Sequence, residues 1–173
     1  MRKFELTTDT KMLLGRKLFR IKALISFGNV RAGDMGGYIE KEGNLSQSGN
    51  AWVYGNAKVS GNAKVFGDAE VFGDAEVYGN AEVYGDAWVY GDAWVSGNAD
   101  YATASGFGSE YRTTTFFKLK DSNEIGVRCG CFYGTIKEFR EKVKETHGET
   151  KKAKEYLMLA DLMEYRFSEE KKA

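Results

Sequence analysis

The sequence predicts a mainly β protein: a short parallel β-solenoid between an N-terminal α/β cap and a C-terminal module of two strands and two helices. Two observations support this fold class. Residues 51–98 repeat one six-residue unit, Ala-x-Val-x-Gly-Asn/Asp, eight times without interruption. Residues 136–167 instead carry apolar side chains at helical spacing. We therefore divide the chain into an N-terminal cap at 1–38, a repeat region at 39–100 and a C-terminal module at 101–173.

The N-terminal cap combines predicted strands with one predicted helix. Residues 3–7 favour an extended strand, and residues 17–25 alternate apolar and polar side chains as a strand does. Between them, residues 7–15 predict a short helix that ends at Gly15. The glycine-rich run at 33–37 then leads into the first coil.

Each repeat unit predicts a short strand followed by a corner. Its Ala and Val are two positions apart, so both point to the same side of a strand, and the residues that flank Val point to the other side. The Gly-Asn or Gly-Asp pair tolerates positive φ and turns the chain. A solenoid stacks each strand on a copy one coil away and so buries all the Val and Ala side chains together.

This pattern resembles the hexapeptide-repeat superfamily of left-handed parallel β-helices. That superfamily repeats an aliphatic residue with a small residue four places on, and three hexapeptides make one triangular coil. The matching units begin at Val53, Val59, Val65, Val71, Val77, Val83, Val89 and Val95. The resemblance implies left-handed winding and coils of 18 residues.

Two degenerate units precede the regular ones. Residues 39–44 and 45–50 keep the Gly-Asn corner but place Ile39 and Leu45 in the Ala position. We interpret them as a first coil with an altered, capping face. With the regular units they make about three coils.

Residues 18 apart should lie above one another, which assigns the outward side chains to three walls. Lys58 then comes under Glu76. Lys64 comes under Glu82 in the same way, so each lysine of the repeat meets a glutamate. The first wall collects five aromatic rings and one acid, namely Trp52, Tyr54, Glu70, Phe72, Trp88 and Tyr90.

An aromatic wall of this size is unusual on the surface of a monomer. A partner subunit, the chain's own flanks or a ligand could cover it. We favour self-association, because the resemblance implies homotrimers packed side by side. The clefts of such trimers also bind small molecules in that superfamily, so these alternatives overlap.

The C-terminal module begins with a predicted β-hairpin. Residues 114–120 and 124–133 have the composition of two strands, and residues 121–123 form the turn. Thr135 and Glu138 then have the spacing of a capping box, which starts a helix.

Two helices complete the predicted ββαα module. The first ends at Gly148, and the second begins near Thr150 and extends through Phe167. The apolar face of the first helix consists of Ile136, Phe139 and Val143.

Over nearly its whole length the chain also looks like small hexapeptide-repeat proteins encoded by phages and prophages. Residues 19–57 and 134–157 carry this resemblance. It implies a protein that acts in the cytoplasm of an infected bacterial cell.

The charge balance limits the partners that the sequence supports. With 25 basic and 25 acidic residues the net charge is zero, which does not favour general binding to nucleic acid or to an anionic membrane. No apolar run reaches the length of a membrane span, and the N-terminal residues lack the pattern of a secretory signal. We expect a cytoplasmic protein that does not bind DNA, RNA or a membrane directly.

The residues do not predict an enzyme. Acyltransferases of the hexapeptide-repeat superfamily use a histidine base beside the coils, and carbonic anhydrases on that scaffold bind zinc with three histidines. Residues 51–98 contain no histidine or cysteine, and the single histidine is His147. Cys129 and Cys131 are expected to be reduced thiols on one strand face. We predict no catalytic residue, no metal site and no cofactor.

We expect instead a non-catalytic, phage-encoded protein with a counter-defence role, which captures a nucleotide-like host signal or blocks a host protein. Aromatic rings offer stacking platforms for bases, and arginines of the hairpin offer donors to phosphates. The candidate ligand-binding or interface residues are Trp52, Tyr54, Phe72, Tyr78, Trp88, Tyr90, Trp94, Arg112 and Arg128. A structural or scaffold trimer of a phage and a degenerate acyltransferase are the alternatives.

Overall fold

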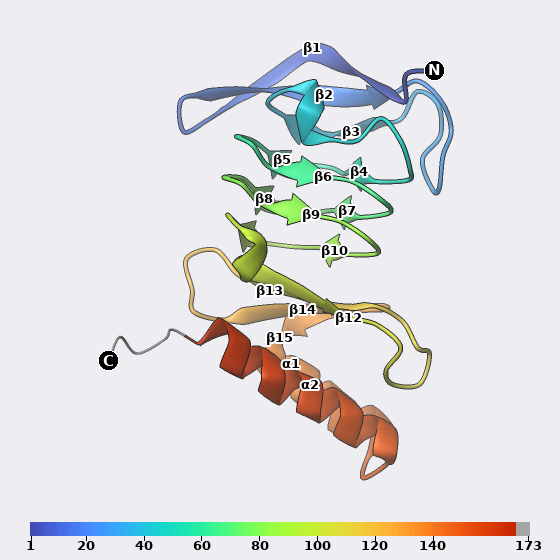
Figure 1. The fold of residues 1–173 in the computed structure, drawn as a ribbon, viewed down its shortest axis with the longest axis vertical. Coiled ribbons are helices and arrows are strands. Elements are labelled where there is room, and N and C mark those ends of the chain that lie inside the picture. The colour runs from blue at the N-terminus through green and yellow to red at the C-terminus, as the bar shows by residue number, and fades with distance from the viewer. Residues whose placement is uncertain (169–173) are drawn as a thin grey trace.

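The protein is an elongated stack of three parts. A computed structural model describes residues 1–168. The N-terminal strands lie at one end, the coils of the solenoid follow, and two helices lie at the other end (Figure 1). The chain is therefore mainly β, as the sequence predicts, and its α-helices are confined to the C-terminal part. The N-terminal cap is made of strands and is not the predicted α/β unit.

Three strands form the N-terminal cap: β1 (Phe4–Leu13), β2 (Arg16–Ala23) and β3 (Met35–Ile39). They pair antiparallel in chain order. The other edge of β3 pairs in parallel with β5 (Lys58–Val59), the first solenoid strand beneath it. The cap is therefore joined to the solenoid by backbone hydrogen bonds.

The helix expected at residues 7–15 is wrong, because β1 runs through this segment. Its threonines are β-branched and favour a strand. Leu14 and Gly15 both have positive φ, 48° and 79°, which is the conformation of a two-residue hairpin turn. Gly15 therefore turns a hairpin instead of ending a helix.

The glycines before the first coil are required for close packing. A Cβ on Gly36 would lie 2.6 Å from Ile21 and 2.7 Å from the Trp52 ring. A Cβ on Gly37 would lie 2.5 Å from the carbonyl oxygen of Ala57. These two positions let β3 lie directly against the first coil.

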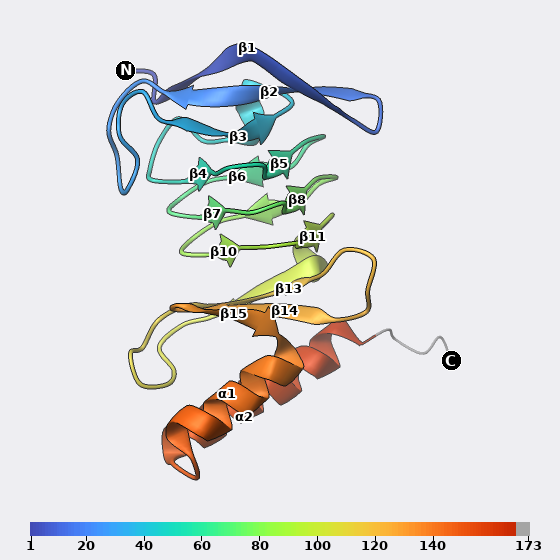
Figure 2. The same ribbon diagram turned by 180° about the vertical axis from the view of Figure 1, so that it is seen from behind.

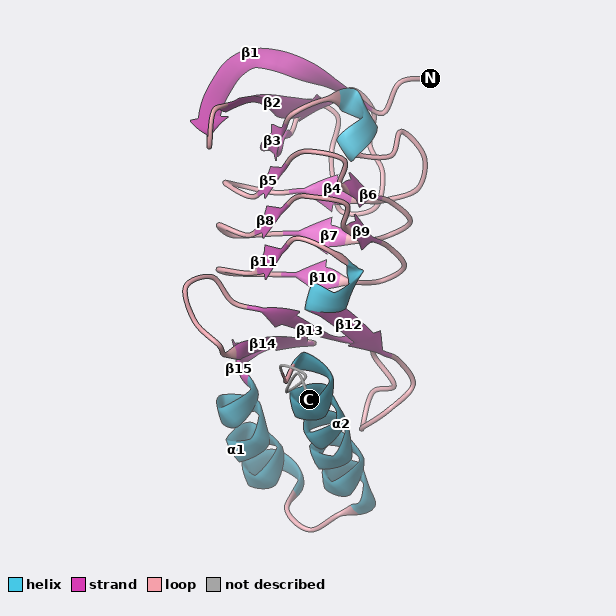
Figure 3. Ribbon diagram, turned by 60° about the vertical axis from the view of Figure 1, so that its left-hand side comes forward, coloured by secondary structure: helices cyan, strands magenta, loops and turns pink. Residues whose placement is uncertain are grey.

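Short stacked strands build the solenoid (Figure 3). They are β4 (Trp52–Val53), β5, β6 (Lys64–Val65), β7 (Glu70–Val71), β8 (Glu76–Val77), β9 (Glu82–Val83), β10 (Trp88–Val89) and β11 (Trp94–Val95). Each strand pairs in parallel with a copy 18 residues away in the chain. The first wall is β4, β7 and β10; the second is β5, β8 and β11; the third is β6 and β9.

The inward side chains of the solenoid confirm the prediction of its core. The valines and alanines of the repeat are fully buried. The second wall continues the cap, so that one six-stranded sheet has the order β1-β2-β3-β5-β8-β11. The predicted solenoid of about three coils is therefore confirmed, and its left-handed winding stays a prediction.

The first coil departs from the predicted register. Ile39 pairs with Val59, and Leu45 pairs with Val65, so the spacing is 20 residues instead of 18. Ile39 and Leu45 occupy the Val position, and their assignment to the Ala position is wrong. The two additional residues lie in the corner after Leu45.

The outward charges stack as the 18-residue spacing predicts. Lys58 and Glu76 are register partners, with Nζ 3.4 Å from Oε1. Lys120 of the C-terminal module contacts the same oxygen at 3.2 Å. Lys64 and Glu82 are also register partners, although no ion pair joins them within the described part of the chain.

The C-terminal module has four strands and two helices: β12 (Tyr101–Ala104), β13 (Thr114–Lys118), β14 (Ile125–Cys129), β15 (Phe132–Thr135), α1 (Ile136–His147) and α2 (Lys151–Phe167). The hairpin of β13 and β14 is predicted, whereas β12 and β15 are not. The antiparallel sheet has the order β12-β13-β14-β15. Short 3-10 turns at Glu42–Asn44 and Asn98–Asp100 flank the regular coils.

The predicted starts of both helices are confirmed. Thr135 Oγ1 accepts a hydrogen bond from the backbone N–H of Glu138, whose side chain accepts one from the N–H of Thr135. Thr150 caps α2 by accepting from the N–H of Ala153.

The expected position of the cysteines is wrong. Gly130, with a φ of 56°, ends β14, so Cys131 lies in the turn that follows. Cys129 and Cys131 are both free thiols, but they do not share a strand face.

Two apolar cores hold the molecule together. One joins the solenoid to the cap through residues such as Phe4 and Ile21, and the other lies between the C-terminal sheet and the helices. β13 serves both cores, because Phe117 belongs to the first and Phe116 to the second. Within residues 1–168, no helix has both the length and the apolar character needed to cross a membrane.

Candidate functional site

A groove of about 760 Å³ lies along the first wall, between the two ends of the molecule. The 24–34 loop of the cap and the 105–113 loop of the C-terminal module lie on the same side as this wall (Figures 1 and 2). The side chains that give the groove its chemistry are Asp68, Glu70, Asp86, Trp88, Arg112 and Arg128. A cavity of this volume accommodates a ligand of nucleotide size.

Arg128 covers two aromatic rings of the first wall. Its guanidinium carbon lies 5.2 Å from the ring centre of Trp88 and 4.9 Å from that of Tyr90, which are cation–π distances. Its Nη1 donates to the carbonyl oxygen of Phe132 at 3.4 Å. Its Nε is buried and has no hydrogen-bond partner among residues 1–168. A planar cation with an unused donor therefore lies beside Trp88.

The other outward column of the first wall is a stack of half-buried rings. Tyr54 and Phe72 are parallel, with ring centres 4.2 Å apart, and Phe72 lies 5.6 Å from Tyr90. Tyr133 of β15 lies 4.8 Å from Tyr90. Gly91 makes room for it, because a Cβ there would collide with the phenol of Tyr133. The C-terminal sheet thus covers the lower end of the stack.

Glu70 is the acidic residue of this aromatic wall, and it lies between Trp52 and Trp88 in the strand register. The hydroxyl of Tyr54 donates to Glu70 Oε1 at 3.1 Å. Burial raises the pKa of Glu70; the Tyr54 hydrogen bond lowers it, and the charge of Asp68 raises it further. Such a carboxylate is stabilised by a ligand that donates hydrogen bonds to it.

The two sides of the groove carry opposite charges. The solenoid contributes Asp68, Glu70 and Asp86, and the C-terminal module contributes Arg112 and Arg128. Arg112 makes one exposed ion pair, at 3.8 Å, and such pairs are weak enough to rearrange. The groove therefore suits a ligand with hydrogen-bond donors at one end and negative charge at the other.

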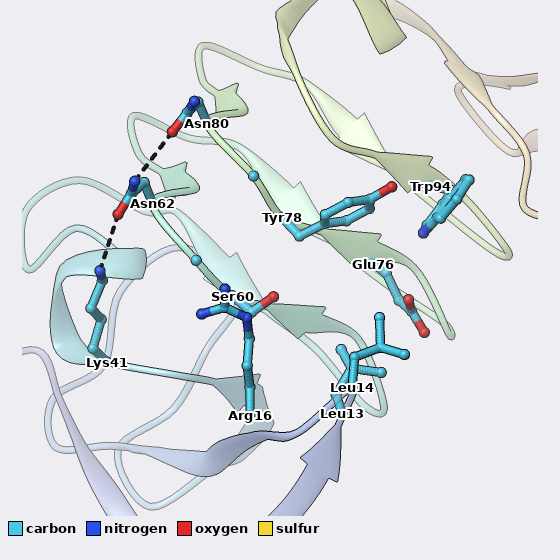
Figure 4. A pocket seen from close by; sticks show the side chains of 12 residues that line it. Leu13, Leu14, Arg16, Lys41, Ser60, Asn62, Glu76, Tyr78, Asn80 and Trp94 are labelled. Carbon is cyan, nitrogen blue, oxygen red and sulfur yellow. Dashed lines mark hydrogen bonds between the residues drawn. The ribbon is translucent and has the colours of Figure 1, made fainter.

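A smaller cavity, of about 290 Å³, lies over the second wall (Figure 4). Tyr78 and Trp94 form its aromatic side, with ring centres 5.5 Å apart. Leu13 and Leu14, at the β1–β2 turn, lie across from these rings (Figure 4). The cavity is thus apolar on two sides.

The polar groups of this second cavity already have partners. Glu76 is bound by two lysines. Lys41 donates to Asn62 at 3.4 Å, and Asn62 donates to Asn80 at 3.3 Å (Figure 4). Arg16 forms an ion pair with a glutamate at 2.9 Å. The second cavity therefore offers a ligand fewer unused polar groups than the first-wall groove does.

The predicted site residues separate into distinct places. The first-wall groove contains Trp88, Arg112 and Arg128. The second cavity contains Tyr78 and Trp94. The stacked column consists of Tyr54, Phe72 and Tyr90.

Trp52 belongs to none of these places. It is only 1% exposed, because Phe4 and Phe27 pack edge-on against it at 6.2 and 5.4 Å. The chain's own N-terminal segment covers this end of the aromatic wall. In this structure Trp52 is a core residue with no surface to offer a ligand or a partner, contrary to its selection as a candidate.

The sequence analysis does not select Asp68, Glu70 and Asp86 of the groove, nor Tyr133 beside the stacked rings. The available signal for Glu70 is that it is the only acid on an otherwise aromatic wall. Tyr133 carries no such signal, because no repeat pattern predicts how the C-terminal sheet docks on the last coil.

The cysteines and the histidine meet in a third cavity, of about 260 Å³. Cys129 accepts a hydrogen bond from Thr114 Oγ1 at 3.2 Å, and its sulfur lies 3.9 Å from the hydroxyl of Tyr156. His147 stacks on Tyr156 at 5.8 Å. Across residues 1–168, no three His, Cys, Asp or Glu side chains are grouped so that they could hold a metal ion.

No protein-family model matches the chain, and no curated protein matches it either. The groove itself is therefore the basis for a functional proposal.

Proposed function

We propose that the chain is a non-catalytic binding protein that captures a nucleotide-like molecule in the first-wall groove. The supporting observation is the meeting of Trp88, Glu70 and Arg128 in one groove, although they come from two different parts of the chain. Trp88 is half-buried, Glu70 accepts one hydrogen bond at Oε1, and Arg128 donates one from Nη1, so other parts of each side chain can contact a planar, charged ligand.

A nucleotide fits the charge pattern of the groove from end to end. Its base stacks on the planar surface that Arg128 and Trp88 form together, since nucleobases stack on both guanidinium and indole planes. Amino hydrogens on the edge of the base are donated to Glu70. The phosphate pairs with Arg112, whose guanidinium can form two parallel hydrogen bonds to it.

The setting of this capture follows from the resemblance to phage and prophage hexapeptide-repeat proteins. In that setting the ligand is a nucleotide signal of the infected bacterial cell, and its removal from solution is the counter-defence activity. Nothing in the proposal requires chemistry on the ligand, because binding alone lowers its free concentration.

A side-by-side trimer is part of the same proposal. Phe66 and Tyr84 stack on the third wall with ring centres 5.4 Å apart, and Tyr84 is exposed. This outward aromatic pair, with its exposed Tyr84, is the observation that favours subunit contact, and it also suits the alternative of a structural phage trimer. A ligand-binding measurement distinguishes the binding protein from the structural trimer, because a purely structural trimer is not expected to bind a ligand in the groove.

Calorimetric titration of the full chain with AMP, GMP, CMP and UMP tests the proposal. We expect at least one nucleotide to bind and to raise the melting temperature. Trp88→Ala should weaken its affinity about 5- to 150-fold, because stacking on an aromatic ring contributes about 1–3 kcal/mol per base. Arg112→Ala should weaken the affinity for the nucleotide but leave the affinity for the corresponding nucleoside unchanged, because the nucleoside has no phosphate.

Trp94→Ala serves as the matched control, because it removes a tryptophan that is 41% exposed and lines the second cavity instead of the groove. It should bind nucleotides as the unsubstituted chain does. Absence of binding for all four nucleotides, or equal binding by Trp88→Ala, would contradict the proposal.

A further inference from the structure

The outer face of α2 is apolar although nothing in the described structure covers it. Met158, Leu162 and Tyr165 are 69%, 54% and 81% exposed. They are spaced four and three residues apart, so they form one stripe along the helix. The buried residues of α2, Ala153, Tyr156, Ala160 and Met163, lie on the opposite face.

The stripe is specific to α2. Within residues 1–168, the neighbouring helix α1 exposes no large apolar side chain, and the two helices lie side by side (Figure 3). A polar helix beside an apolar stripe resembles the rim and core of a protein–protein interface.

The charges beside the stripe are self-complementary. At 100° per residue, Lys154 and Asp161 lie on the same flank of the stripe, seven residues apart. Two antiparallel copies of α2, related by a two-fold axis near residues 157 and 158, bring Lys154 of each copy opposite Asp161 of the other. The same axis places Lys151 near Tyr165 of the second copy, where a cation–π contact is favourable.

Asp161 is free to take part in such a contact. Its Oδ1 accepts from Arg140 Nη2 at 2.7 Å, but its side chain stays 70% exposed. Arg140 also binds Glu164 at 2.8 Å, so it remains neutralised when Asp161 turns to a lysine.

We propose that the apolar stripe of α2 is a homodimer interface, in which α2 packs antiparallel against α2 of a second copy. The two-fold arrangement uses the same patch on both chains. The contact lies at the helical end of the molecule, so it is independent of the groove and of any trimer formed through the solenoid walls. Because one helix pair buries less than a standard interface of about 1,600 Å², the dimer should dissociate on dilution.

Native mass at high and low protein concentration tests the interface. Met158→Glu should halve the native mass at a concentration where the unsubstituted chain is paired, whatever assembly the walls contribute. Met12→Glu is the matched control, because Met12 is 68% exposed on β1, far from α2. It should leave the native mass unchanged.

A charge exchange tests the antiparallel register. Neither Lys154→Asp alone nor Asp161→Lys alone should form the dimer. In each variant, positions 154 and 161 carry like charges, and they face one another at both ends of the helix pair. A mixture of the two variants should recover the dimer, since every facing pair is then complementary. Circular dichroism checks that each variant keeps its helices. A native mass that is the same for Met158→Glu, Met12→Glu and the unsubstituted chain, or a mixture that does not pair, would overturn the proposal.

Discussion

Lys3 shows at the scale of one residue how the irregular first coil is used. Its Nζ donates to the carbonyl oxygens of Ala51 at 2.9 Å and Gly49 at 3.4 Å, and it lies 4.9 Å from the ring centre of Phe27. Its backbone N–H donates to Gln47 Oε1 at 2.8 Å. The sequence does not predict this site, because the corner that receives Lys3 is the one that breaks the repeat.

The burial of Lys3 makes stability depend on pH. Burial lowers the pKa of Lys3 from 10.5 to about 8, although the charge of Asp68 opposes the shift. The unfolded chain therefore keeps this proton at pH values where the folded chain has released it, so stability rises as the pH passes through about 8 and beyond.

We expect the free energy of unfolding to increase by about 1 kcal/mol between pH 7 and pH 9 from this residue. Urea unfolding of the full chain at both pH values measures the increase. Lys3→Met removes the titrating group and should remove the increase; an identical pH dependence in the variant would count against the assignment.

Residue patterns alone predict part of the groove. The flanking positions of the repeat are sufficient to place Trp88 and Glu70 on one wall. Arg128 has no such signal, since its place over Trp88 depends on how β14 is oriented beneath the last coil. Local periodicity predicts on which face of a strand a side chain lies, but it does not predict which residue from another part of the chain packs against that side chain.

At the scale of elements, the repeat predicts strands far better than the flanks do. The position of each two-residue strand is determined by its Val and by the Gly-Asn or Gly-Asp corner that follows. The local preferences of these residues agree with the solenoid fold. Residues 7–15 lack such agreement: their apolar end and Gly15 suit a helix, but pairing with β2 makes them a strand. Tertiary pairing overrides a weak local preference there.

The junction between solenoid and C-terminal sheet depends on Asp100. Its Oδ2 accepts hydrogen bonds from the N–H and hydroxyl of Ser96 at 2.9 and 2.6 Å and from the N–H of Gly97 at 3.2 Å. Its Oδ1 lies 2.8 Å from Lys118 Nζ. Burial raises the pKa of Asp100, but the hydrogen bonds from Lys118 and Ser96 outweigh burial and hold the pKa below its ordinary value.

Asp100→Asn should therefore destabilise the protein by about 1–3 kcal/mol at pH 7, the range for a buried hydrogen-bonded charge. A lowered pKa in the folded state gives stability that is fully present above the ordinary value of 3.8 and is lost as the pH falls from that value through the lower pKa of the folded state. The difference between the variant and the unsubstituted chain should thus shrink toward pH 3.

Chemical denaturation at pH 7 and pH 3 measures this difference. Asp74→Asn is the control, because Asp74 is an exposed corner residue and other units of the repeat carry Asn at that position. An equal loss of stability in both variants would show that Asp100 has no special role.

At the scale of the whole molecule, the sequence predicts the order of the parts but not how they join. The solenoid, the hairpin and the helix pair all follow from periodicity and capping. The six-stranded sheet that links the cap to the second wall, and the sharing of β13 between two cores, depend on contacts between distant segments. Such contacts between distant segments do not produce a periodic pattern in the sequence, so the sequence does not predict them.

The two cores should respond separately to substitution. Phe116 and Phe117 are neighbours on β13, both fully buried, and they point into different cores. Phe116→Leu should speed amide exchange in α1 and α2, and Phe117→Leu should speed it in the coils, each through a loss of about 1 kcal/mol. Hydrogen exchange measured by mass spectrometry resolves the two regions, and uniform acceleration by both variants would show a single cooperative unit.

The regular coils, from Ala51 onward, have a constant length. Each of them returns to the same wall after 18 residues and advances the stack by one strand spacing of about 4.8 Å. Duplicating three repeat units would therefore move the 24–34 loop and the 105–113 loop, at the two ends of the groove, further apart by one strand spacing. Deleting three units would bring them closer by the same distance, and neither change would alter a residue of these loops. If the groove binds a ligand as proposed, the length of that ligand can change by duplication of repeat units alone, while the residues at the two ends of the groove stay the same.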